Sequence, residues 1–226
     1  MSVKRGVDFE ALLRASARSR HAELCRHSNA EQVMGMPAER FRRRWTASDV
    51  RRLIAEAPLA SPRYELVDGD LVVTPSPSFR HQEAVTLLLV ALSSYCRAEG
   101  VGHAMASPSD IELEPESVRQ PDVFVLPAAE RRRLAREGFP ARELLLAVEV
   151  VSPGSAHDDR VRKRALYQRR VPEYWVVDTD ARVVERWRAG ATQPEVLSDR
   201  MEWLPAGAHE PLILDLAALF GRVWAE

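Results

Sequence analysis

Two acidic residues, Asp122 and Glu149, lie at positions where the surrounding pattern of β-rich and apolar residues gives no reason for a carboxylate. Asp122 follows Pro121 at the start of a short β-rich run, and the proline favours either an edge strand or the start of a strand. Glu149 interrupts an almost continuous apolar run, where an unpaired buried carboxylate would be strongly destabilising, so it needs a positively charged partner. If Asp122 lies on a neighbouring strand, the pair forms an all-oxygen site suited to Mg²⁺ or Mn²⁺.

Lysine usage supplies a third residue. Lysine occurs only at Lys4 and Lys163, against 30 arginines, so the chain uses arginine almost wherever a positive charge suffices. Lysine offers a compact ammonium whose pKa falls when it is desolvated, whereas arginine is a broad, permanently charged fork. Lys163 is therefore predicted to act where a small cation is needed beside a carboxylate-bound metal.

These three residues need elements that bring them together. Residues 144–151 are nearly all apolar, which is typical of a strand buried on both faces. A helix is predicted at about 158–170 and a further strand at 173–178. Such a βαβ unit makes the two strands parallel neighbours in one sheet, with the helix packed on its face.

Capping, periodicity and turn signals predict the remaining elements. Helices are predicted at residues 46–58, 79–98, 128–137 and 215–220, a hairpin turn at Asp68-Gly69, one or two strands within 102–114, and strands at 121–126, 183–188, 201–204 and 211–214. The mixture of helices and strands indicates an α/β fold with a mixed β-sheet flanked by helices.

The charge distribution separates an arm from a body. Residues 1–52 carry a net charge of +6 and residues 53–226 a net charge of −7. We therefore predict a basic arm, helical or flexible, at 1–44 and one domain at 45–226. The two cysteines are too few for a disulfide framework, and no apolar run is long enough to cross a membrane, so we expect a cytoplasmic protein.

Short motifs recur in order along residues 44–220. They are Tyr64-Glu-Leu-Val-Asp-Gly69, Arg80-His-Gln82, Ser107-Pro-Ser-Asp110, Gln120-Pro-Asp122, Val148-Glu-Val-Val-Ser-Pro153, then Asp159, Lys163 and Tyr167, and Glu173-Tyr-Trp-Val-Val-Asp178. Their order and spacing resemble the bacterial Uma-type restriction endonucleases of the PD-(D/E)XK superfamily. The resemblance implies a restriction-endonuclease-like fold over most of the chain.

The resemblance also implies roles for single residues. Asp122 and Glu149 would ligate Mg²⁺ or Mn²⁺ together with the main-chain carbonyl of Val150, and Lys163 would stabilise the attacking water or the scissile phosphate. In the parent superfamily the lysine lies two residues after the acid, a position that Val151 occupies here. The family pattern places the lysine 14 residues after Glu149, on the following helix.

Other polar residues near these positions have two interpretations. His81 and Glu83 either support the metal ligands or simply begin the long helix, and Asp159 either approaches the metal or caps its own helix. An arginine cluster on the helix of Lys163 is either a solvated face or a phosphate-contact surface beside the site. Its members nearest the lysine are Arg160, Arg162 and Arg164.

The sequence therefore predicts a metal-dependent endonuclease that hydrolyses DNA phosphodiester bonds, acting as a homodimer because many such enzymes cut the two strands in pairs. The alternative is a catalytically inactive nuclease-fold module that binds nucleic acid or a protein partner. A structural domain with a buried ion pair at Glu149 is the third interpretation.

Overall fold

The structure is a computed structural model that describes residues 45–56, 63–67, 69–74, 77–114, 117–151 and 159–225. The arm predicted for residues 1–44 and Asp68 of the predicted turn lie outside these ranges. No helix within them is long and apolar enough to cross a membrane.

The described part of the chain is built on a six-stranded sheet with the strand order β3-β4-β5-β6-β7-β8. Its strands are Gly102–Ala106 (β3), Val123–Pro127 (β4), Leu146–Val151 (β5), Glu173–Asp178 (β6), Val183–Arg188 (β7) and Glu195–Leu197 (β8). Neighbouring strands are antiparallel except β5 and β6, which are parallel. The prediction of a mixed sheet in an α/β fold is confirmed.

The predicted βαβ unit is present, but its helix begins differently from the prediction. A π-helical segment, η1 (Asp159–Lys163), precedes the α-helix α6 (Arg164–Arg170), and β6 follows. A π-helical turn closes its hydrogen bonds over five residues and is wider than an α-helical turn; such turns are frequent at functional sites. Lys163 is the last residue of this segment, directly before α6.

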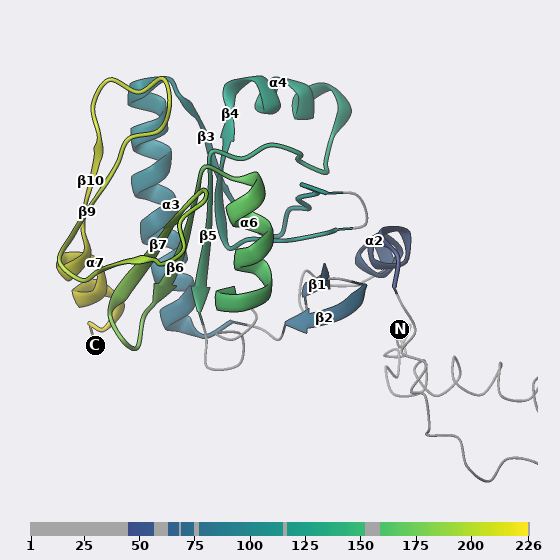
Figure 1. The fold of residues 1–226 in the computed structure, drawn as a ribbon, viewed down its shortest axis with the longest axis horizontal. Coiled ribbons are helices and arrows are strands. Elements are labelled where there is room, and N and C mark those ends of the chain that lie inside the picture. Colours follow the sequence, from purple (N-terminus) through teal and green to yellow (C-terminus); the bar gives the residue numbers. More distant parts are fainter. Residues whose placement is uncertain are drawn as a thin grey trace, which may run out of the picture. The chain divides into compact units, whose positions relative to one another are not determined.

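Helices cover both faces of the sheet, and the pleat of β5 assigns each residue to one of them (Figure 1). Val148 and Val150 pack in the core under α3 (Phe79–Glu99), which also includes Leu88. Ala147 and Val151 pack in the opposite core with Tyr167 of α6. Because side chains alternate along a strand, Glu149 faces α6.

Asp122 lies one residue before β4, and β4 is flanked by β3 and β5. The expectation of a strand start is therefore confirmed, and the alternative of an edge strand is wrong. Val123 is paired with Val148, so continuing the antiparallel register sets Asp122 opposite Glu149 at the end of the sheet.

The predicted hairpin forms beside the sheet. Strands β1 (Arg63–Val67) and β2 (Asp70–Thr74) pair antiparallel, and Gly69 has the positive φ of 84° that the tight turn requires. The N–H of Leu66 donates to the carbonyl of Val118, 2.9 Å away. This bond and the helix α2 (Ala47–Glu56), whose Val50 packs on Leu66, attach the hairpin to the segment that leads to Asp122.

The remaining elements include one strand that the sequence did not predict. The helices α4 (Ala128–Glu137) and α7 (Leu216–Val223) and the paired strands β9 (Arg200–Trp203) and β10 (Leu212–Asp215) match predicted segments. The missed strand, β8, has only three residues and lies at the sheet edge with little burial. So short a strand shows no alternation of apolar and polar residues that could reveal it.

Candidate active site

Asp122 is held at the end of the sheet by two contacts from different elements. Its Oδ2 accepts a hydrogen bond from the backbone N–H of Val150, 2.9 Å away. The Nε2 atom of His81, in the first turn of α3, lies 3.1 Å from the same oxygen. Because an ionised carboxylate only accepts hydrogen bonds, Nε2 carries the hydrogen. The side chain of Asp122 thus joins β4, β5 and α3 at one point.

Glu149 and Lys163 form a buried ion pair. The Nζ atom of Lys163 lies 3.1 Å from Oε1 of Glu149, and the two residues are only 5% and 2% exposed. The hydroxyl of Tyr167, one turn further along, donates to the same Oε1 over 3.4 Å. The residue paired with Glu149 is therefore the lone lysine of the body rather than one of its many arginines.

Glu65 is a third buried acid that the sequence analysis did not single out. Its Oε2 lies 3.0 Å from Nζ of Lys163, and its Oε1 accepts from the N–H of Gln120 over 2.9 Å. Glu65 is 2% exposed and lies on β1 between the buried Tyr64 and Leu66. A carboxylate between two core residues was the available signal, but a hairpin strand commonly has one polar face.

The environment of this cluster keeps Tyr167 protonated. Burial, and secondly the negative charge of Glu149, raise the pKa of Tyr167 well above its usual value. Its hydroxyl therefore stays protonated at neutral pH and donates to Glu149. With Lys163 on the same oxygen, Glu149 is held by two donors from η1 and α6.

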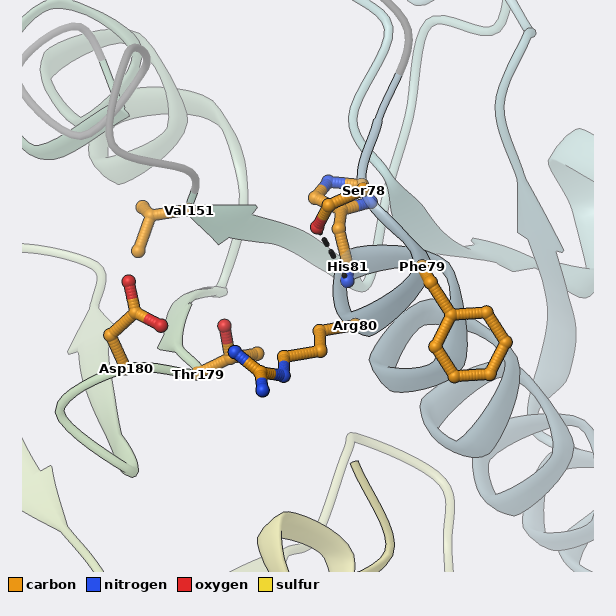
Figure 2. Close-up of a pocket in the computed structure, with 7 residues that line it drawn as sticks. All are labelled: Ser78, Phe79, Arg80, His81, Val151, Thr179 and Asp180. Carbon is orange, nitrogen blue, oxygen red and sulfur yellow. Dashed lines mark hydrogen bonds between the residues drawn. The ribbon is translucent and has the colours of Figure 1, made fainter. Parts of the chain in front are cut away.

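A pocket of about 490 Å³ opens beside Asp122. Its walls are formed by the first turn of α3, the end of β5 and the turn after β6. His81 is the α3 residue that connects these walls to Asp122 (Figure 2). The lining residues are Ser78, Phe79, Arg80, His81, Val151, Thr179 and Asp180. His81 is 6% exposed and contacts both this pocket and Asp122, so the pocket adjoins the acidic site.

The other candidate residues have different positions. Glu83 is partly buried in α3, and no contact joins it to Asp122 or Glu149 in the described part of the chain. The side chain of Asp159 lies outside the described residues. Arg160 forms ion pairs with Asp178 and Glu185 at 2.7 and 2.6 Å. Two arginines have other contacts: Arg162 lies 3.3 Å from Asp70, and Arg164 lies over the ring of Trp187.

The donor set fits a small hard cation. Within the described ranges, no three His, Cys, Asp or Glu side chains are grouped closely enough to hold a metal ion by themselves. Mg²⁺ needs no such cage, because it is usually bound by one or two carboxylates and keeps several waters. Asp122 and Glu149, opposite each other in the continued register of β4 and β5, would supply two such carboxylates, and the carbonyl of Val150 would be a further oxygen ligand, whereas Glu65 contacts Lys163.

The mixed sheet, the helices on both its faces and the βαβ unit at its centre place the chain in the class of restriction-endonuclease-like α/β folds. A family model described as "Putative restriction endonuclease", Uma2, matches residues 50–217, and the chain belongs to this family. A crystal structure of "a putative nuclease belonging to DUF820" from Anabaena variabilis has a similar fold. Its TM-score is 0.62 at 17% identity, over 75% of this chain and 96% of that one. No curated protein matches the chain.

Proposed function

We propose that this protein is a Mg²⁺- or Mn²⁺-dependent endonuclease that hydrolyses DNA phosphodiester bonds. The observation that carries the proposal is the buried Glu149–Lys163 ion pair beside Asp122 at the end of the central sheet. The membership of the Uma2 family and the likeness to a protein titled a nuclease support the same reaction class. The homodimer and the cytoplasmic location expected from the sequence remain predictions.

The proposal gives each residue a task. Asp122, Glu149 and the carbonyl of Val150 would hold the ion, which would supply Lewis-acid polarisation of a phosphoryl oxygen and a water of lowered pKa. Lys163 places a compact positive charge where negative charge develops on the phosphate. Glu65 and Glu149 hold its ammonium from two directions, and Tyr167 restrains the Glu149 carboxylate.

The role of Lys163 is tested by Lys163→Arg, which keeps the charge but enlarges the head group. We expect metal-dependent cleavage of plasmid DNA to fall by roughly 10²-fold or more while the far-ultraviolet spectrum stays unchanged. The reason is that the larger, planar guanidinium cannot put its charge at the point that the compact ammonium occupies without moving one of the two carboxylates. Arg188→Lys, at an exposed position, is the matched control and should cleave normally. Undiminished cleavage by Lys163→Arg would refute the role. Parallel reactions on single-stranded DNA and RNA define the substrate.

Metal binding separates the endonuclease from an inactive nuclease-fold module. Calorimetry with Mg²⁺ or Mn²⁺ should show binding to the wild type and its loss in Asp122→Ala, because a Mg²⁺ site with few protein ligands does not tolerate the loss of a carboxylate. Asp199→Ala, which removes an exposed carboxylate, is the control. A wild type that binds DNA without binding either ion would favour the module.

A further inference from the structure

Two arginines lie near the ring of one tryptophan, and one of them, Arg80, lines the pocket beside Asp122. The guanidinium carbon of Arg80 lies 3.5 Å from the centre of the Trp224 ring, and that of Arg182 lies 5.2 Å from it. The indole is fixed because its Nε1–H donates to the carbonyl of Thr179 over 2.8 Å. Within the described residues neither guanidinium has a carboxylate partner. Two like charges held on one ring repel each other, and a bound anion would relieve that repulsion.

The helix that contributes Arg80 adds a positive end to the same pocket. Helix α3 has 21 residues, begins after Ser78, and has no acidic residue in its first turn. The hydroxyl of Ser78 accepts from the N–H of His81, which leaves the preceding N–H groups of the turn directed out of the helix. Such helix starts attract phosphate groups.

A buried atom of His81 points to a ligand independently of the helix. The Nε2 atom of this side chain is bonded to Asp122, and the Nδ1 atom is buried without a hydrogen-bond partner in the described part of the chain. His81 also lines the pocket, so the unpartnered Nδ1 belongs to a residue of the pocket wall. A buried polar atom without a protein partner is commonly satisfied by a bound water, and such a water can also bridge to a ligand.

We propose that this pocket binds a phosphate group of the substrate strand next to the group being cleaved. Arg80 supplies charge in the wall of the pocket, Arg182 adds charge beside the Trp224 ring that Arg80 contacts, the start of α3 supplies N–H donors, and His81 links the bound phosphate to Asp122. The inference rests on the proposed function for its ligand, a nucleic-acid phosphate. Asp180 is the one acid among the lining residues; its carboxylate lies toward Val151, whereas Arg80 extends toward Thr179 (Figure 2).

The test is a titration with inorganic phosphate in the presence of EDTA, followed by the NMR signal of the Trp224 indole N–H. The signal is assigned by its loss in Trp224→Phe. We expect phosphate to shift it, and the double variant Arg80→Gln with Arg182→Gln to weaken binding by about tenfold or more, because charge-assisted contacts are lost. Asp180→Asn should tighten binding severalfold, because it removes a repulsive charge. Arg97→Gln, at the far end of α3, should change nothing.

Oligonucleotides then distinguish the two sources of phosphate. Equal shifts of the Trp224 signal by strands with and without a 5′-phosphate assign the pocket to internal phosphodiesters, and a preference for the phosphorylated strand assigns it to a strand end. A Trp224 signal that responds to neither phosphate nor DNA, or binding that is equally strong in the double variant, overturns the inference. The titration requires neither a metal ion nor cleavage, so it tests the pocket separately from the nuclease activity. If the protein bound phosphate but never cleaved DNA, the proposed function would be refuted while the assignment of the pocket to phosphate would stand.

Discussion

The ammonium group of Lys163 is held by two carboxylates that come from distant parts of the sequence. It contacts Glu65 from the hairpin and Glu149 from the central strand, at 3.0 and 3.1 Å. A buried cation between two carboxylates has little freedom to move, so the head group is positioned before any substrate arrives. Glu65 is thus a positioning residue for Lys163, and Gln120, bonded to its other oxygen, ties it to the segment before Asp122.

Replacing Glu65 by glutamine should separate positioning from folding. In Glu65→Gln the amide oxygen can still accept from the N–H of Gln120, but the charge facing Lys163 is lost. We expect DNA cleavage to fall by about tenfold through kcat, with a loss of about 1–3 kcal/mol in the free energy of unfolding. Single-turnover cleavage and urea denaturation measure the two effects.

The exposed ion pair of Glu202 with Arg200 provides the comparison. Glu202→Gln removes the same charge from the surface and should leave both cleavage and stability within error. If Glu65→Gln cleaved DNA as fast as Glu202→Gln does, the positioning role of Glu65 would be abandoned.

Among the elements, strands β3 and β4 approach each other closely at Gly102, near the edge of the sheet. A Cβ added at Gly102 would overlap the carbonyl oxygen of Leu126 and press on side chains of Leu145 and Val125. Gly102 opens β3 and pairs with Pro127, where β4 ends. A glycine in a strand marks such close approaches of two backbones. The contact lies at the end of β4 that is opposite to Asp122, so it fixes the strand pairing rather than the site itself.

The variant Gly102→Ala should therefore be destabilised, because a backbone carbonyl cannot move aside as a flexible side chain would. We expect a loss of about 1–3 kcal/mol in the free energy of unfolding, measured by urea denaturation. Gly221→Ala is a matched control: Gly221 lies in α7, no atom lies within 4 Å of the added Cβ, and the change should stabilise by about 0.5–1 kcal/mol. Equal stability of Gly102→Ala and wild type would contradict the close approach.

For the whole molecule, hydrogen bonds of buried side chains connect elements that the backbone ladder leaves separate. Glu130 of α4 accepts hydrogen bonds from Arg133 and, over 2.6 Å, from the N–H of Arg142 in the segment leading to β5. The hydrogen bond from Arg133 holds the pKa of Glu130 below its usual value, against the opposing effect of burial. The stability that this carboxylate contributes is therefore present above its unfolded-state pKa and is lost as the pH falls through its lower native pKa.

The stability of Glu130→Gln as a function of pH tests this linkage. At pH 7 we expect a loss of about 1–3 kcal/mol. The difference from wild type should shrink as the pH falls below about 4, where the unfolded state binds the proton first, and should be smallest below the lower native pKa of Glu130, where both states bind it. Glu137→Gln serves as the control because Glu137 contacts the same arginine but is largely exposed. A difference that stays constant from pH 7 to pH 3 would show that Glu130 acts through packing alone.

The sequence by itself predicted most of the elements and singled out the three principal candidate residues. Period-two and period-3.6 patterns, proline breaks and a capping serine reflect local physics, so the helix after Ser78 and the strand around Glu149 were predictable. Lys163 stood out because arginine occupies almost every other cationic position. Composition reveals such an exception without any knowledge of the fold.

Only the tertiary structure decided which partners these residues have. Glu65 lies 98 positions before Lys163 and His81 lies 41 before Asp122, and no local pattern encodes either contact. The π-helical start of the βαβ helix and the contact of Arg80 with Trp224 also arise from packing between distant segments. The periodicity of apolar residues in the sequence indicates which face of a helix or strand is buried. Which side chain contacts that face depends on how the helices and strands pack against one another.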